Sequence, residues 1–127
     1  MNSIIIDTNV IIYYLAGNKK WVNVINKLLD KKYKLYISVI TEMELFAWPT
    51  LTANEQDKIN AILDCVKIIN IDSKLARIAG FLRQQVKSRT ADSLVAATAK
   101  SLDLPLLTNN AKDFKKFKGV AVISNVK

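Results

Sequence analysis

The sequence of 127 residues contains no histidine, a single cysteine, three glycines and two prolines. Without histidine, the chain cannot form a Ser-His-Asp triad, a Cys-His pair or a histidine-ligated zinc site. The lone Cys65 excludes an internal disulfide and a cysteine-rich metal cluster, so nothing here favours a secreted protein. The glycines lie too far apart for a phosphate-binding loop or a dinucleotide fingerprint. Any chemistry must therefore rest on carboxylates, hydroxyls, amides and basic side chains.

Long apolar runs are also missing. The longest stretch without a charged residue is 8–18, well short of the roughly 18–20 residues that a membrane span needs. No basic region precedes an apolar core at the N-terminus, so we expect no signal peptide. These absences predict a cytoplasmic protein with no membrane partner.

Acidic residues are outnumbered, with 11 Asp and Glu against 19 Lys and Arg and a net charge of +8. An excess of this size favours a polyanionic partner such as a nucleic acid. The length suits one domain, and half of the residues are hydrophobic, as in an ordinary globular protein. We therefore expect residues 1–127 to form a single folded domain.

Short apolar runs alternate along the chain with longer amphipathic segments. Runs typical of strands are Ile4–Ile6, Leu35–Val39, Val66–Ile71, Leu104–Leu107 and Val120–Ile123. Between them, apolar residues recur at helical spacing within residues 10–15, 21–29, 59–66, 75–86 and 94–102. This alternation predicts an α/β fold with a mostly parallel sheet flanked by helices.

Several acids and amides follow the predicted strands. In an open parallel sheet, ligands bind beyond the carboxyl ends of the strands. Candidates at this edge are Asp7 and Thr8 after the first strand, Glu44 after the second, Asp92 at the start of the alanine-rich segment, and Thr108, Asn110 and Asp113 after the fourth. Carboxylates from distant parts of the chain are therefore expected to converge on one edge.

Each of these acids also has a purely structural interpretation. Asp7 can cap the helix that follows it, and Asp92 suits the first turn of a helix because of the helix dipole. Thr41 and Glu44 fit the S/T-x-x-E capping box. Asn110 suits a turn after a strand. A cap, however, needs no particular place in the sheet, whereas a metal site needs several acids at one end.

Clustered carboxylates repel one another unless a cation lies between them. Mg²⁺ and Mn²⁺ prefer oxygen ligands and commonly take one or two carboxylates together with water and phosphate. A bound ion polarises a phosphoryl oxygen and lowers the pKa of a bound water, so phosphodiester hydrolysis becomes possible without histidine. The composition thus favours a metal-dependent mechanism.

Four segments resemble the motifs of PIN domains. They are Ile4–Asn9 with Asp7, Ser38–Leu45 with Glu44, Thr90–Ala99 with Asp92, and Leu106–Phe114 with Asn110. They occur in the family's order and span nearly the whole chain. The size of the chain looks most like that of the VapC-type toxins of toxin–antitoxin pairs. Many members carry an aspartate where Asn110 stands, so Asp113 is an alternative fourth ligand.

The resemblance implies a three-layer PIN-like fold with a five-stranded parallel sheet in the order 3-2-1-4-5. It implies a Mg²⁺- or Mn²⁺-dependent endoribonuclease that is inhibited by a small cognate antitoxin and forms a homodimer. By the same resemblance, Asp7, Glu44 and Asp92 are both the catalytic and the metal-binding acids. Thr8, Thr108, Asn110 and Asp113 are additional candidates for this site.

Basic residues near the third and fourth motifs are candidates for binding RNA phosphates; they are Arg83, Lys87, Arg89 and Lys112. Two other functions remain open at this point. One is a catalytically degenerate PIN-like RNA-binding or scaffold module. The other is a Mg²⁺-binding receiver-like phosphoacceptor domain, although Asp7 lacks the adjacent acid that such domains have. We further expect Cys65 to be buried, because it lies on an apolar stripe.

Overall fold

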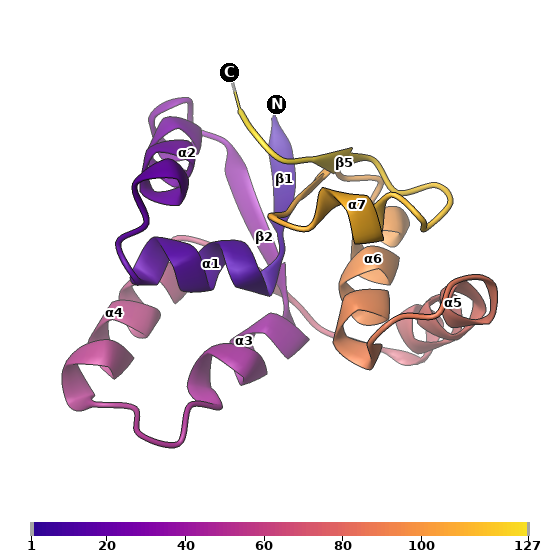
Figure 1. The fold of residues 1–127 in the computed structure, drawn as a ribbon, viewed down its shortest axis with the longest axis horizontal. Coiled ribbons are helices and arrows are strands. Elements are labelled where there is room, and N and C mark those ends of the chain that lie inside the picture. The colour runs from indigo at the N-terminus through magenta and orange to yellow at the C-terminus, as the bar shows by residue number, and fades with distance from the viewer. Residues whose placement is uncertain (1, 127) are drawn as a thin grey trace.

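A parallel β-sheet forms the centre of the computed structural model, which describes residues 2–126 (Figure 1). Its strands are β1 (Ser3–Ile6), β2 (Lys34–Ser38), β3 (Lys67–Ile69), β4 (Leu106–Leu107) and β5 (Val122–Ile123). They lie in the order β3-β2-β1-β4-β5, and each pair of neighbours is parallel. This confirms the predicted α/β class and strand order. The order also excludes a receiver-like fold, in which the strands lie as 2-1-3-4-5.

The strands are shorter than the apolar runs that predicted them. The second run was expected to continue through Val39, but Ser38 ends β2 because its Oγ accepts a hydrogen bond from the Ile40 N–H at 3.2 Å and so caps a helix. The fourth run was expected to begin at Leu104. The Leu104 N–H instead bonds to the Ala99 carbonyl at 3.0 Å, so this residue closes the preceding helix.

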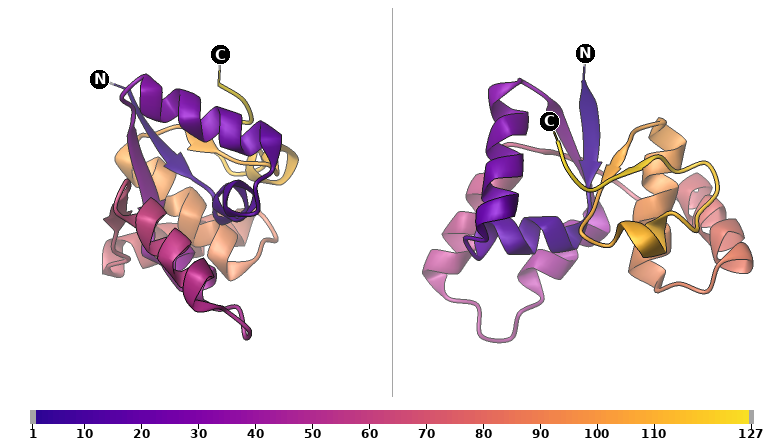
Figure 2. Two further views of the ribbon diagram at one scale, coloured as in Figure 1. Left: turned by 90° about the vertical axis from the view of Figure 1, so that its left-hand side faces the viewer. Right: turned by 45° about the horizontal axis from the view of Figure 1, so that its top comes forward.

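Seven helices surround the sheet within residues 2–126. They are α1 (Thr8–Leu15), α2 (Lys19–Asp30), α3 (Val39–Phe46), α4 (Ala53–Leu63), α5 (Ser73–Gln85), α6 (Thr90–Leu102) and α7 (Ala111–Phe114). Helices α1, α2 and α4 cover one face of the sheet, and α5 and α6 cover the other (Figure 2). This is the predicted three-layer arrangement.

Side-chain caps define where several of these helices begin. Asn18 Oδ1 accepts from the Trp21 N–H at 3.3 Å in α2, and Asp72 Oδ1 accepts from the Leu75 N–H at 2.9 Å in α5. Such bonds satisfy N–H groups that the first helical turn leaves without partners. These two caps fix the first residues of α2 and α5, which pack on opposite faces of the sheet.

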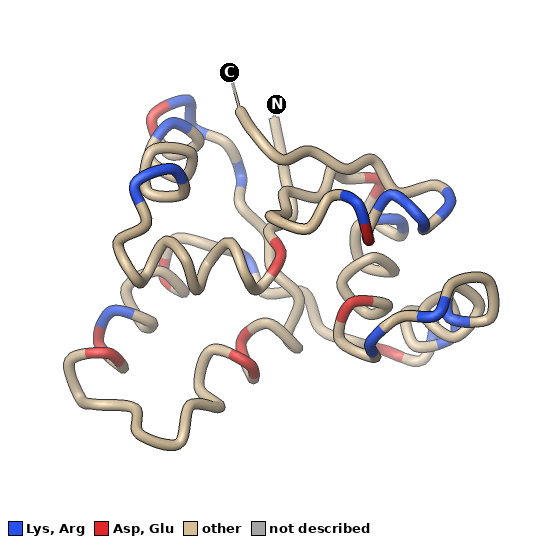
Figure 3. Tube along the Cα trace, viewed as in Figure 1, with Lys and Arg blue, Asp and Glu red and all other residues tan. Residues whose placement is uncertain are grey.

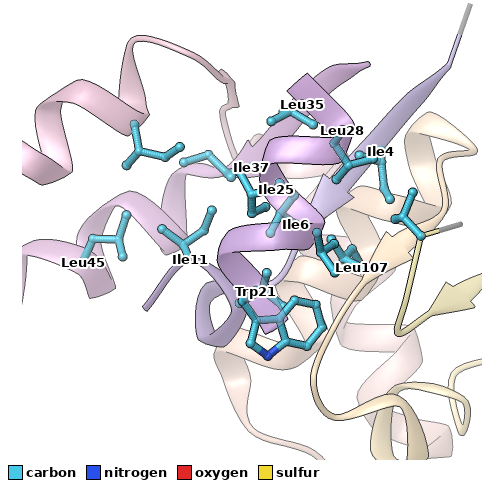
Figure 4. Close-up of a cluster of buried hydrophobic side chains, with 14 of the residues drawn as sticks. Ile4, Ile6, Ile11, Trp21, Ile25, Leu28, Leu35, Ile37, Leu45 and Leu107 are labelled. Atoms are coloured by element: carbon cyan, nitrogen blue, oxygen red, sulfur yellow. The ribbon is translucent and has the colours of Figure 1, made fainter. Parts of the chain in front are cut away.

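The central strand β1 is buried from both sides. Ile4 and Ile6 belong to the core beneath α1 and α2, which Figure 4 shows around Trp21 and Ile25. Ile5 points to the opposite core, beneath α5 and α6. Side chains alternate across a strand, so a uniformly apolar strand is one that is covered on both faces. The residue that follows this strand is therefore held in a rigid position.

Cys65 does not lie in either core. It is exposed in the turn after α4, where its Sγ lies 3.5 Å from the Ala61 carbonyl oxygen. The expectation of a buried thiol was wrong because the helix ends at Leu63, three residues before the apolar stripe does. Within residues 2–126, every helix is too short or too polar to cross a membrane.

Candidate active site

The predicted acidic residues lie at the carboxyl edge of the sheet. Asp7 follows β1, and Glu44 lies on α3, the helix that continues directly from β2. Asp92 is in the first turn of α6, and Asp113 lies on α7, after β4. Figure 3 shows acidic positions on these four segments around the ends of β1 and β4.

Asp7 is the most deeply buried of these acids, with only 3% of its surface exposed. It occupies the N-cap position of α1, yet its side chain makes no capping hydrogen bond. Instead, its Oδ2 accepts a hydrogen bond from Thr108 Oγ1 at 2.9 Å. The capping interpretation of Asp7 is therefore wrong, and burying this carboxylate requires another explanation.

Glu44 does not take part in a capping box either. The N-cap of α3 is Ser38, three residues before Thr41, so Thr41 and Glu44 both lie inside the helix. The capping box of this chain is at Thr52 and Glu55, where α4 begins. The local pattern at Thr41 was misleading because Ser38 starts the helix one turn earlier.

Glu44 is instead held by a chain of two hydroxyl groups. Thr8 Oγ1 donates to Glu44 Oε1 at 2.8 Å and lies 2.8 Å from Thr41 Oγ1. A hydroxyl has one proton to donate, so the Thr41 hydroxyl must donate to Thr8. Thr41 is fully buried. From the sequence, Thr41 has only the capping interpretation, because no local signal reveals a partner 33 positions away.

The carboxylates influence one another electrostatically. The pKa of Asp7 is raised from its ordinary value of 3.8 to about 6, chiefly by burial. The charges of Asp92 and Glu44 contribute to this rise, and hydrogen bonds from the Thr108 hydroxyl and the Thr8 backbone oppose it. Burial also raises the pKa of Asp92; the Arg89 charge opposes this shift, whereas Glu44 and Asp113 add to it. The structure thus brings Asp7, Glu44, Asp92 and Asp113 into one electrostatic cluster.

Asn110 and Asp113 contact each other rather than Asp7. Asn110 Nδ2 donates to Asp113 Oδ2 at 2.8 Å, and Lys116 Nζ lies 3.9 Å from the other oxygen of Asp113. The Asn110 backbone N–H donates to Thr108 Oγ1 at 2.9 Å. The Thr108 hydroxyl oxygen accepts this bond, and its own proton is donated to Asp7. The backbone of Asn110 therefore orients the hydroxyl that holds Asp7.

A cleft of about 490 Å³ opens beside these acids. Its polar lining consists of Asn9, Lys87, Ser88, Arg89, Asp92, Asn110, Asp113 and Lys116. Of the basic residues selected from the sequence, Lys87 and Arg89 line this cleft. Arg83 instead donates to Thr90 Oγ1 at 3.1 Å, and Lys112 is exposed on α7. Lys116 belongs to the basic cluster that follows the fourth motif. Ser88 had no signal in the sequence, and its buried Oγ has no hydrogen-bond partner within residues 2–126.

The donor atoms at this edge suit a hard divalent cation, since they are carboxylate, hydroxyl and amide oxygens. A cation would also offset the burial and the mutual repulsion that together raise the pKa of Asp7 and Asp92. In the part of the chain that the structure describes, no three Asp, Glu, Cys or His side chains lie close enough together to surround one ion. The arrangement therefore fits an ion held by one or two carboxylates, with water filling the remaining positions.

The sequence matches the family model described as "PIN domain" over residues 4–120. Ribonuclease VapC1 of Rickettsia felis is 33% identical over 132 aligned positions, which cover 95% of this chain and 95% of that protein. Ribonuclease VapC19 of Mycobacterium tuberculosis is 27% identical, covering 89% of this chain and 93% of the relative. Both alignments span nearly the full length of each protein.

Solved structures show the same architecture. A toxin–antitoxin complex from Klebsiella pneumoniae contains a chain that is 28% identical, with a TM-score of 0.78 and 98% of both chains covered. VapBC2 from Rickettsia felis, bound to a promoter DNA fragment, aligns with a TM-score of 0.83 and covers 95% of this chain and 97% of that one. At 24% identity, the second likeness is one of fold alone.

Proposed function

The chain belongs to the PIN-domain family, and we propose that it is a metal-dependent endoribonuclease, the toxin of a toxin–antitoxin pair. The observation that carries this proposal is the convergence of Asp7, Glu44 and Asp92 on one edge of the sheet, where Glu44 and Asp92 add to the effect of burial in raising the pKa of Asp7. A degenerate scaffold would have no need to bury Asp7 beside two further acids. The names of the two ribonuclease relatives support the same conclusion.

In this proposal, Asp7, Glu44 and Asp92 form the acidic site for a Mg²⁺ or Mn²⁺ ion, with one or two of these carboxylates contacting the ion directly and Asp113 as a further candidate. When bound, the ion would polarise the scissile phosphate and lower the pKa of a water molecule. Thr108 fixes the carboxylate of Asp7, and Thr8 and Thr41 fix that of Glu44. A water molecule would lose a proton and add its oxygen to phosphorus, the bond from phosphorus to the leaving sugar oxygen would break, and that oxygen would gain a proton.

The cleft beside the acids is the proposed RNA site. Lys87, Arg89 and Lys116 line it, so it offers positive charge next to the carboxylates. Phosphate contacts of this kind supply much of the affinity of proteins for nucleic acids. Arg83 and Lys112 are proposed to extend this basic surface, because both are exposed near its margins.

The endoribonuclease proposal is tested with purified protein and a mixture of structured and single-stranded RNAs in the presence of Mg²⁺. We expect discrete internal cleavage products that accumulate with time, analysed on sequencing gels. A triple variant, Asp7→Asn with Glu44→Gln and Asp92→Asn, purified in parallel, controls for contaminating ribonucleases. Identical products from the triple variant, or none from the wild type over a broad range of RNAs, would contradict the proposal.

The proposed antitoxin is a small protein with an apolar segment. A groove of about 320 Å³ between α1, α3 and α4 is lined largely by apolar side chains: Ile12, Leu15, Leu45, Trp48, Leu51 and Ile59. Trp48 is 55% exposed there, and exposed apolar surface of this kind marks interaction sites. The toxin–antitoxin complex similar to this chain supports such a partner. A small neighbouring reading frame whose product co-purifies with the chain is the test.

We also propose that residues 1–127 form one domain, which acts as a homodimer in the cytoplasm. The single sheet and the family match over residues 4–120 support the single domain. Phe46 and Met43 on α3 remain exposed and are candidates for a contact between subunits. Light scattering should give twice the chain mass of 14.3 kDa, and a monomeric mass would contradict the dimer.

Asn110→Asp is expected to tighten Mn²⁺ binding by about three- to tenfold, because a fourth negative charge near a cation contributes roughly 1 kcal/mol in a hydrated site. The new carboxylate would face Asp113, to which the amide now donates at 2.8 Å. Without metal, the variant should therefore be slightly less stable than the wild type. Isothermal titration without RNA measures the affinity, and a thermal melt in EDTA measures the stability.

The matched control is Asn109→Asp, which adds the same charge at the exposed neighbouring position. Its Mn²⁺ affinity should stay within about twofold of wild type, since solvent screens an exposed charge. If Asn110→Asp changes Mn²⁺ binding no more than this control does, Asn110 lies outside the metal site. Asp113 would then be the better fourth ligand.

A further inference from the structure

Arg89 contacts the acidic cluster from the segment between α5 and α6. It stands at the N-cap position of α6 and makes no side-chain capping bond there. Its Nη2 lies 3.4 Å from Glu44 Oε2, and its charge lowers the pKa of Asp92 against the effect of burial. One guanidinium group therefore interacts with two of the three acids that the proposed function assigns to the metal.

Both carboxylate oxygens of Glu44 have partners from the chain itself. Oε1 accepts from Thr8 at 2.8 Å, and Oε2 accepts from Arg89 at 3.4 Å. Thr8 is buried, whereas the Arg89 side chain is 68% exposed. The contact between Arg89 and Glu44 is longer and more exposed to water than the Thr8 hydrogen bond. It is therefore the weaker of the two and the one that can break. A divalent ion at Glu44 would repel the guanidinium and compete with it for Oε2.

Arg89 also lines the cleft that is proposed to hold RNA, together with Lys87 and Lys116. A guanidinium binds carboxylate and phosphate groups with the same fork of N–H donors. The side chain is exposed and flexible enough to contact Glu44 in one state and a phosphate in the cleft in another. Such an exchange would free Glu44 at the moment when substrate arrives.

We propose that Arg89 is an internal counter-cation, which competes with the divalent ion for Glu44 in the substrate-free protein and transfers to a substrate phosphate when RNA binds. The inference rests on the metal site and the RNA site of the proposed function. Arg89 thereby weakens metal binding before RNA arrives and strengthens RNA binding afterwards. Metal and RNA affinities become coupled through one side chain, and this coupling acts equally in both directions.

The first test is a titration with Mn²⁺ in the absence of RNA, in which the EPR signal of the free ion reports how much Mn²⁺ remains unbound. Arg89→Gln should bind Mn²⁺ about three- to tenfold more tightly than wild type, because a repelling charge is removed. Arg89→Lys keeps the charge and should stay within about twofold. Arg77→Gln, which removes the same charge from an exposed position on α5, should also stay within about twofold. The increase in Mn²⁺ affinity caused by Arg89→Gln should be smaller at about 1 M salt, where the Debye length is only about 3 Å.

The second test measures binding of a short fluorescent single-stranded RNA without metal. Arg89→Gln should bind about three- to tenfold more weakly, with a salt dependence reduced by about one phosphate contact. Arg77→Gln should bind as wild type does. Opposite changes in metal and RNA affinity are the signature of the exchange, because a merely structural role would weaken both.

Unchanged or weaker Mn²⁺ binding by Arg89→Gln overturns the inference, and so does an equal gain in Arg77→Gln. The outcome is separate from that of the proposed function. Tighter Mn²⁺ binding by Arg89→Gln in a protein that cleaves no RNA would support the counter-cation and refute the ribonuclease. Metal-dependent cleavage by the wild type, with no effect of Arg89→Gln on Mn²⁺ binding, would support the ribonuclease and refute the counter-cation.

Discussion

Replacing Asp7 by asparagine is expected to abolish RNA cleavage and, at the same time, to stabilise the metal-free protein. The side chains have nearly the same shape, and an amide oxygen can still accept the hydrogen bond from Thr108. The variant lacks the charge that would hold the metal ion. If the transition state loses several kcal/mol of stabilisation by the metal, the rate of RNA cleavage falls by about 10²–10⁴-fold.

The gain in stability follows from the pKa of Asp7, which burial raises from 3.8 to about 6 in the folded protein. Between about pH 4 and pH 6, the folded state keeps a proton that the unfolded chain has lost, so the wild type becomes less stable as the pH rises. Above about pH 6, the full cost of the buried charge is present. Asp7→Asn avoids this cost and should be about 1–3 kcal/mol more stable at neutral pH. Below about pH 4, the difference should vanish.

Chemical denaturation in EDTA at several pH values measures this effect, and a cleavage assay measures the activity. The matched control is Asp57→Asn, at an exposed position on α4, which should change neither stability nor cleavage appreciably. A folded Asp7→Asn protein that cleaves RNA at the wild-type rate would remove Asp7 from the active site. A variant less stable than wild type at pH 7.5 would show that the carboxylate stabilises the fold.

Removing divalent metal should reduce RNA cleavage by the wild type to background. The chain has no histidine to act as an alternative general base near neutral pH, and the acids lie together at one sheet edge. Adding Mg²⁺ or Mn²⁺ back in excess over the chelator should restore cleavage. Equal cleavage with and without EDTA would exclude the metal mechanism.

A thermal melt gives an independent measure of the same interaction. Binding to the folded state raises stability by about 2.7 kcal/mol when the ion is present at about 100 times its dissociation constant. Wild type should therefore melt at a higher temperature in Mn²⁺ than in EDTA, whereas Asp7→Asn should show little of this difference. A wild type whose melting temperature does not respond to Mn²⁺ would contradict a site of this affinity.

Much of the fold could be read from the chain itself. The alternation of apolar runs with helical stripes predicted the α/β class and a mostly parallel sheet flanked by helices, as the two cores on either side of the sheet confirm. The strand order came from the resemblance to PIN domains, and the structure confirms it. Strand ends were less predictable, because Ser38 and Leu104 use their hydrogen-bonding groups for neighbouring helices.

The candidate acids could also be chosen from the sequence. Asp7 follows a buried strand directly, and residues after parallel strands meet at one edge of the sheet. Their structural alternatives could not be resolved at that stage, because a capping box depends only on local spacing. Thr41 and Glu44 satisfy that spacing, yet the helix begins at Ser38, and the fit is therefore coincidental.

The sequence by itself determined the α/β class and the candidate acids, because hydrophobic periodicity and the place of an acid after an apolar run are local features of the chain. Only the tertiary structure decided how these acids are held. The Thr108 hydroxyl that bonds Asp7 lies 101 positions away, and Arg89 lies 45 positions from Glu44. These contacts exist because β4 pairs with β1, and α3 packs beside α1 and α6. Hydrogen bonds and charge pairs need particular atoms within about 3–4 Å of each other, and packing of the whole chain sets those distances.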